Sequence, residues 1–135
     1  MNYSISQVAE RFQIEPHTLR YYEKEGIVIP ERTKTGIRTY TEENISQLEM
    51  TMCLKSTGMS LKNIKKYFDM VSIGDCTLDA RLKIFTDHRQ HVLDEIDVLK
   101  SHLARIEGKI CWYGEYARKR KEDIDLRDAE QDKIS

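Results

Sequence analysis

Arginine and tyrosine side chains gather in one short run of the sequence, TLRYYEKEGIVIPERTKTGIRTY, which covers residues 18–40. The run contains three arginines and three tyrosines. Guanidinium groups and phenol hydroxyls donate hydrogen bonds to phosphate oxygens, and arginine also binds the guanine edge in the major groove. The composition of this run therefore indicates contact with nucleic acid.

Three cysteines, Cys53, Cys76 and Cys111, are the other reactive groups of the sequence. Their odd number and the absence of a CxxC pair argue against a disulfide framework and favour a reducing compartment. Cys76 and Cys111 are 35 residues apart, or roughly 50 Å along an unbroken helix. These two thiols could therefore approach each other only between two antiparallel chains.

Catalytic motifs are missing from the sequence. His88 and His91 are three residues apart, but no HExxH, glycine-rich phosphate loop or nucleophile elbow accompanies them. Solvated or interhelical hydrogen-bonding histidines explain this pair. The sequence predicts no enzyme, no cofactor and no dedicated metal site.

The chain of 135 residues has room for one ordinary domain and an accessory element. Hydrophobic residues make up 39% and charged residues 33%, with only two prolines, which predicts a mainly α-helical, soluble fold. No apolar stretch approaches the ~20 residues that span a bilayer and no signal peptide is evident, so we expect a cytoplasmic protein without membrane contact. Because the net charge is only −1, nucleic-acid binding would depend on local charge.

Two short helices with a tight connection are predicted at the N-terminus. Ser4 and Gln7 form a capping box for a helix over about residues 5–12. Pro16 suits the first position of a second helix, which Gly26 can close in the left-handed conformation. This arrangement predicts a helix-turn-helix motif.

Three side chains, His17, Thr18 and Arg20, fall in the first turns of the predicted recognition helix, the part that enters the major groove. Adjacent Tyr21 and Tyr22 differ by about 100° around a helix. One tyrosine can therefore pack inward while the other offers its hydroxyl to a phosphate. Core packing is the alternative for the tyrosines, and a solvated surface is the alternative for the arginines.

A small β-hairpin, or wing, is expected after the second helix. Residues 27–29 and 37–40 are β-prone and flank a turn at residues 33–36. Alternation along the second strand would place Arg38 and Tyr40 on one polar face.

Helices are predicted for the rest of the chain, with Thr41 and Ser60 as caps of a third and a fourth helix and Gly58 between them. From Leu78 onward, apolar residues recur at alternating steps of four and three, as in a coiled-coil seam. The seam residues are Leu82, Phe85, Arg89, Val92, Ile96, Leu99, Leu103 and Ile106. Because the chain has no second long helix to cover this stripe, the pattern predicts a homodimer; a helix folded back on its own domain is the alternative.

The end of the long helix is less sharply defined by the sequence. Gly108 either ends the helix or merely weakens it. Residues 118–135 are highly charged and are predicted to form a flexible tail. Arg89 is the one charged residue of the seam, where a polar side chain commonly fixes the register.

Several of these motifs resemble the signature of MerR-family transcriptional regulators. The matching runs are TLRYYE at residues 18–23, GIRTY at residues 36–40 and LKSTGMSL at residues 54–61. The resemblance covers roughly residues 3–116. It implies a winged helix-turn-helix domain with a second, helical wing over residues 1–72, followed by an antiparallel coiled coil over residues 76–116 that joins two protomers.

The resemblance also implies a set of DNA contacts. By motif position, the residues are Thr18, Arg20, Tyr21, Arg38, Tyr40 and Lys55. Ile37 departs from the pattern, since many members carry tyrosine there. Family members bind an inverted-repeat promoter operator and untwist or bend it so that RNA polymerase can engage both promoter elements, and the same mechanism is implied here.

Two branches of the family differ in the signal that they detect. The segments at residues 36–38 and 74–77 together with Cys53 are similar to the aldehyde- and electrophile-responsive branch, in which a cysteine at this place is the proposed sensor. A half-buried structural cysteine is the alternative. The spacing of Cys76 and Cys111 resembles the metal-responsive branch, in which thiolates of both chains bind a soft metal. A helix-turn-helix adaptor that binds protein in place of DNA is a further alternative.

Replacement of Leu99 by aspartate would bury an unpaired charge in the predicted seam. We therefore expect Leu99→Asp to dissociate the dimer, as measured by analytical ultracentrifugation. A dimer that survives at micromolar concentration would refute the seam.

Overall fold

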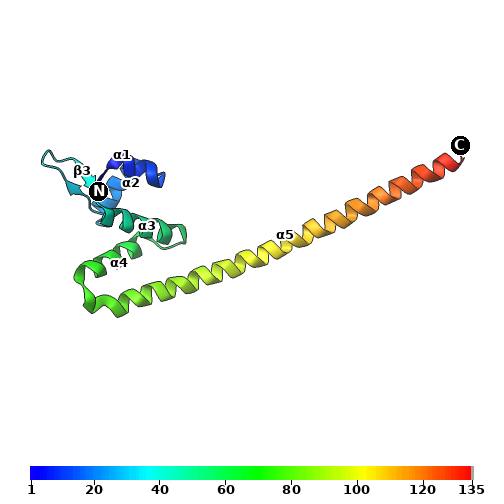
Figure 1. The fold of residues 1–135 in the computed structure, drawn as a ribbon. Coiled ribbons are helices and arrows are strands. Elements are labelled where there is room, and N and C mark those ends of the chain that lie inside the picture. The colour runs from blue at the N-terminus through cyan, green and yellow to red at the C-terminus, as the bar shows by residue number, and fades with distance from the viewer. Residues whose placement is uncertain (135) are drawn as a thin grey trace. The chain divides into compact units, whose positions relative to one another are not determined.

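The computed structural model describes residues 1–134, and Figure 1 colours its elements along the chain. In chain order the elements are β1 (Tyr3–Ser4), α1 (Ile5–Phe12), α2 (Pro16–Lys24), β2 (Glu31–Arg32), β3 (Arg38–Tyr40), α3 (Glu42–Ser56), α4 (Leu61–Ile73), the 3-10 turn η1 (Asp75–Thr77) and α5 (Leu78–Ile134). The predicted mainly α fold with a small sheet is therefore confirmed. The chain divides into two compact units, one ending at Arg89 and one beginning at Gln90.

The helix-turn-helix forms as its capping residues predict. The Ser4 hydroxyl accepts a hydrogen bond from the Gln7 backbone N–H at 3.2 Å, and the Gln7 side chain accepts one from the Ser4 N–H at 2.9 Å. Gln13 ends α1 in the left-handed conformation, with φ of 53°. Pro16 then begins α2, and Gly26 adopts a φ of 74° just after that helix. Both helices thus begin and end on local signals.

The sheet has three antiparallel strands in the order β1-β3-β2. The prediction that residues 27–29 form a strand of the wing is wrong, because strand pairing begins only at Glu31. Ile27 instead donates its N–H to the Tyr22 carbonyl at the end of α2, and both Ile27 and Val28 are buried in the core. Strand β1, which pairs Tyr3 with Tyr40, is not predicted by any local pattern.

One hydrophobic core joins the two helices of the motif to the sheet, α3 and α4. Its buried members are Val8, Ala9, Leu19, Tyr22, Ile27, Val28, Tyr40, Ile45, Leu48, Leu54 and Ile64. Every element from α1 to α4 except β2 contributes at least one of these side chains. The recognition helix is therefore held by the same core that holds the helical hairpin α3–α4.

The beginning of α5 is attached to α4 through the turn between them. The Thr77 hydroxyl lies 2.8 Å from the Met70 carbonyl and 2.7 Å from the Gly74 carbonyl. Arg81 donates to the Gly74 carbonyl at 3.0 Å. The ring of Phe85 packs edge-on against Tyr67, with 4.9 Å between the ring centroids. The first turns of α5 are thus part of the N-terminal unit.

Helix α5 continues without a break from Leu78 to Ile134, so Gly108 does not end it. The described part of the segment predicted as a flexible tail, residues 118–134, is helical. Ion pairs one turn apart favour the helix there, because Arg118 contacts both Glu115 and Glu122 at 2.8 Å. None of the described helices combines the length and apolarity needed to cross a membrane.

Most of the predicted seam residues remain exposed in the single chain. Leu82 and Leu99 are each 66% exposed, and Ile96, Leu103 and Ile106 are exposed as well. Phe85 and Val92 are half-buried. Phe85 packs against the core of the N-terminal unit. Within residues 1–134, most apolar side chains of this stripe are therefore not covered by other residues.

Asn44 fixes the start of α3 from a buried position. Its carbonyl oxygen accepts the Thr41 backbone N–H at 3.0 Å, and its own backbone N–H donates to the Thr41 hydroxyl at 3.2 Å. Its amide nitrogen donates to the Ile29 carbonyl at 3.1 Å. The residue therefore ties the loop before the wing to the third helix.

We expect Asn44→Ala to lower the free energy of unfolding by about 1–3 kcal/mol, since it removes the side-chain half of a capping box and the hydrogen bond to the Ile29 carbonyl. Denaturant unfolding followed by circular dichroism measures this change. Asn63 is the matched control, because it occupies the same position of α4 but is exposed and its side chain makes no hydrogen bond within residues 1–134. A loss in Asn63→Ala as large as in Asn44→Ala would contradict this account.

Candidate nucleic-acid interface

The side chains of α2 divide into a buried face and an exposed face. Leu19 and Tyr22 are each 1% exposed, whereas Tyr21 is 46% exposed and Arg20 is also exposed. Because successive residues turn by about 100° around a helix, the burial of Leu19 and Tyr22 directs Arg20 and Tyr21 outward. The prediction that one of the two tyrosines packs inward is confirmed, with Tyr22 inside.

The first turn of α2 presents further polar groups. His17 is exposed and Thr18 is half-buried. Pro16 occupies the first helical position, where its missing N–H costs no intrahelical bond. The predicted contacts His17, Thr18, Arg20 and Tyr21 thus lie together on one short helix.

The wing is tied to α2 by ion pairs centred on Glu23. The carboxylate contacts Arg38 Nε at 2.6 Å with one oxygen and Arg32 Nη2 at 2.9 Å with the other. Arg32 also donates to the Gly36 carbonyl at 3.0 Å, inside the turn of the wing. Partial burial raises the pKa of Glu23, but hydrogen bonds and charges from Arg38 and Arg32 outweigh it and hold this pKa below its usual value.

Tyr40 does not share an exposed polar face with Arg38, so this prediction is wrong. Tyr40 is fully buried and Arg38 is half-buried, while Ile37 is 63% exposed. The reason is that β3 lies in the middle of the sheet, between β1 and β2, and its end packs into the core. The Tyr40 hydroxyl has no hydrogen-bond partner within residues 1–134. Burial, and then the charge of Glu23, raises the pKa of Tyr40.

Lys55 belongs to α3 but reaches toward the recognition helix. Its ammonium nitrogen lies 3.3 Å from the Tyr22 hydroxyl and 5.8 Å from the centroid of the Tyr22 ring. The lysine is itself exposed. It therefore adds a cation beside the buried side of α2 from a different element.

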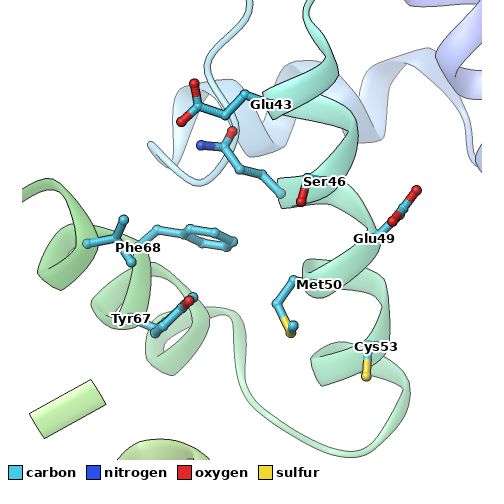
Figure 2. A pocket seen from close by; sticks show the side chains of 9 residues that line it. Glu43, Ser46, Glu49, Met50, Cys53, Tyr67 and Phe68 are labelled. Atoms are coloured by element: carbon cyan, nitrogen blue, oxygen red, sulfur yellow. The ribbon is translucent and has the colours of Figure 1, made fainter. Parts of the chain in front are cut away.

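All three cysteines are exposed. For Cys53 this differs from the alternative of a half-buried structural cysteine. The adjacent Leu54 occupies the core position instead, at 2% exposure. Cys53 borders a pocket between α3 and α4, and Figure 2 shows Met50 of α3 facing Tyr67 and Phe68 of α4 across it. Cys53 follows about one helical turn after Met50 (Figure 2).

The backbone of Cys53 is linked by side chains to the start of α5. The Thr57 hydroxyl lies 2.8 Å from the Cys53 carbonyl and 2.7 Å from His88 Nε2. A hydroxyl that donates to the carbonyl can accept from a protonated His88 Nε2 at the same time. The end of α3 and the third turn of α5 therefore share one hydrogen-bonded threonine.

Within residues 1–134, the side chains that could hold a metal ion do not cluster. Cys76 lies in η1 and Cys111 in α5. Across residues 1–134, no group of three or more histidine, cysteine, aspartate or glutamate side chains is placed to bind one ion. The alternative of a shared Cys76 and Cys111 site would need a second chain.

The sequence profile of MerR HTH family regulatory proteins matches residues 3–71, which span both wings and the recognition helix. The chain belongs to the MerR family. It is 38% identical over 115 residues to an HTH-type transcriptional regulator of Haemophilus influenzae, with 84% of each chain covered. It is also 38% identical over 92 residues to the HTH-type transcriptional regulator AdhR of Bacillus subtilis, with 67% of this chain and 66% of AdhR covered.

A solved MerR-family structure has a similar fold. It is HiNmlR, described as a regulator lacking the sensor domain and bound to promoter DNA, with 37% identity and a TM-score of 0.79 over 85% of this chain and 92% of that chain. These relatives are transcriptional regulators, in agreement with the prediction that the chain is not an enzyme.

Two features of this MerR-family chain escaped the sequence reasoning. The first is the pairing of Glu23 with two arginines of the wing. Arg32 lies 9 residues and Arg38 lies 15 residues after Glu23 in the sequence. The contact between Thr57 and His88 spans 31 residues. No local periodicity marks such contacts, because they depend on how separate elements pack.

Proposed function

We propose that the chain binds promoter DNA as a homodimer and regulates transcription from that promoter in the cytoplasm. The observation that carries this proposal is the exposed side of α2, where His17, Arg20 and Tyr21 project from a helix whose other side is buried. The likeness to HiNmlR, which is bound to promoter DNA, supports it. The first turns of α2 would enter the major groove, and the wing arginine Arg38 would bind the phosphate backbone.

The dimer would form through the exposed seam of α5. Leu99 and Leu103 lie on that stripe and are more than half exposed in the single chain. Apolar side chains repeated at steps of four and three bury themselves best against a second helix with the same pattern. A second copy of the chain supplies such a helix, and an antiparallel pairing would present the two DNA-binding domains to an inverted-repeat operator.

Regulation would act through the shape of the DNA. Two domains that hold successive half-sites can untwist or bend the DNA between them, at a deformation cost of roughly 1–6 kcal/mol. A change in the geometry of the dimer then alters the spacing of promoter elements that RNA polymerase must engage. The polymerase is thus an indirect partner, and the operator is the direct one.

The signal would be a thiol-reactive electrophile such as an aldehyde or quinone, detected by Cys53. Its exposure and its position beside the pocket between α3 and α4 support this role. The Cys53 thiolate would add to an electrophilic carbon, forming a carbon–sulfur bond, while the oxygen that receives the electron pair takes a proton from water. The 38% identity to AdhR is compatible with this branch of the family.

The adduct could reach the dimer through Thr57. Its hydroxyl contacts both the Cys53 carbonyl and His88, so a shift of the last turn of α3 alters a contact made by α5. In this mechanism the thiol chemistry occurs on α3 and the response occurs on α5. The connection is short and uses residues of the N-terminal unit alone.

Loss of Arg20 or Arg38 tests the DNA-binding surface. We expect Arg20→Ala and Arg38→Ala each to weaken binding to the duplex upstream of the chain's own gene by about 1–3 kcal/mol, without a change in dimer mass. Fluorescence anisotropy gives the affinity. The matched control is Arg105→Ala, which removes an exposed arginine from α5, outside the DNA-binding domain. Unchanged affinity in both head variants, or an equal loss in the control, would contradict the proposed contacts.

Exposure to an aldehyde or quinone tests Cys53. We expect intact-protein mass spectrometry to show one adduct, lost in Cys53→Ser, and in vitro transcription from the same promoter to become unresponsive in that variant. Cys76→Ser, which removes another exposed thiol, should respond like the wild type. Normal induction in Cys53→Ser would exclude this sensor and leave metal binding by Cys76 and Cys111 to be tested by titration.

A further inference from the structure

Glu23 places a negative charge on the surface that would face DNA, so its effect on DNA binding could be favourable or unfavourable. It lies on the recognition helix, two residues after Tyr21 and three after Arg20. A carboxylate near a phosphate backbone repels it, so charge alone predicts that removal of Glu23 strengthens DNA binding. The geometry of the wing leads to the opposite expectation.

The two arginines that Glu23 binds use their donors differently. Arg32 donates one terminal amino group to Glu23 and the other to the Gly36 carbonyl, so both of its amino groups bind within the protein. Arg38 binds Glu23 through Nε alone, at 2.6 Å. Within residues 1–134 its two terminal amino groups have no hydrogen-bond partner. Because the guanidinium is planar and rigid, fixing Nε also fixes the direction of those amino groups.

The environment makes this pairing difficult to replace by water. The side chains of Glu23 and Arg38 are only 20% and 27% exposed. Without the carboxylate, the half-buried guanidinium of Arg38 and the more exposed one of Arg32 would lose the opposite charge that they share. The wing would then lose the connection that holds β2 and β3 against α2.

We propose that Glu23 is a positioning residue for DNA binding, which orients the terminal amino groups of Arg38 toward a phosphate and fastens the wing to the recognition helix. This inference rests on the proposed DNA-binding function. Glu23 itself does not touch DNA. Its favourable effect on the geometry of Arg38 outweighs its repulsion of the phosphates.

Glu23→Gln is the variant that separates the two effects. Glutamine keeps the shape of the side chain, but it has one carbonyl oxygen for two arginines, and its amino group faces the other guanidinium. We expect DNA affinity to fall on the order of tenfold, because each of the two domains of a dimer loses a partly exposed ion pair. Fluorescence anisotropy with the duplex upstream of the chain's own gene measures it.

Glu25→Gln is the matched control for charge. Glu25 follows α2 by one residue, and its side chain makes no hydrogen bond or ion pair within residues 1–134. This variant removes the same negative charge from the same end of the helix. Its affinity should therefore equal or exceed that of the wild type, while Glu23→Gln moves in the other direction.

The Arg38→Ala background shows whether Glu23 acts through Arg38. In that background the single glutamine carbonyl suffices for Arg32, so Glu23→Gln should cause less than about a twofold further loss. The double variant lacks the unpaired Arg38 charge, so it should fold even if Glu23→Gln alone does not. Its affinity can then still be compared with that of Arg38→Ala, and a loss greater than about twofold would overturn the proposal. Circular dichroism establishes that each variant is folded at the assay temperature.

Three results would overturn the proposal while leaving DNA binding intact. They are an unchanged or higher affinity in Glu23→Gln, an equal loss in Glu25→Gln, and a loss from Glu23→Gln that is as large with Arg38→Ala as without it. A wild-type chain that binds its upstream duplex no better than a random duplex of equal length would instead refute the proposed function.

Discussion

Burial of Leu19 and Tyr22 against the core holds α2 in place, because a helix of nine residues is not stable in water by itself. The same burial decides the direction of Arg20 and Tyr21, which lie between them in sequence. The exposed side of α2, which we propose faces DNA, is therefore a consequence of the core, and it needs no separate support along α2. The wing differs, since its short strands contribute little to the core beyond Tyr40, and it depends on the ion pairs of Glu23.

The second constraint is the uncovered stripe of α5. The exposed leucines and isoleucines of this stripe cost about 25 cal/mol for each Å² of apolar surface left in water. Burial of this stripe against a second copy would recover that free energy and join two DNA-binding domains at once. Dimerisation and operator recognition would then share one physical cause.

Features that depend on neighbouring residues were predictable from the sequence. The capping residues Ser4, Thr41 and Ser60 gave correct helix starts, and the turn of about 100° between Tyr21 and Tyr22 predicted that one of them packs inward. Features that depend on distant residues were not. Strand β1, the burial of Tyr40 and the pairing of Glu23 with two wing arginines arise only once the elements pack. The helix beyond residue 116 was not predicted for another reason. Gly108 and Gly114 each cost only about 1 kcal/mol in a long helix, and ion pairs around Arg118 offset part of that cost.

The free energy of the hydrogen bonds around Thr57 is comparable with that needed for a conformational switch. A ligand or adduct shifts a conformational equilibrium only by its difference in interaction with the two states. A typical hydrogen bond contributes about 1 kcal/mol, and coupling free energies between sites are typically about 1–3 kcal/mol. Loss of the Thr57 contacts to Cys53 and His88 would therefore be sufficient for regulation without unfolding any element. Because the proposed adduct on Cys53 would lie on α3 and His88 lies on α5, the difference between the two states would arise at the boundary between the DNA-binding domain and the dimerisation helix.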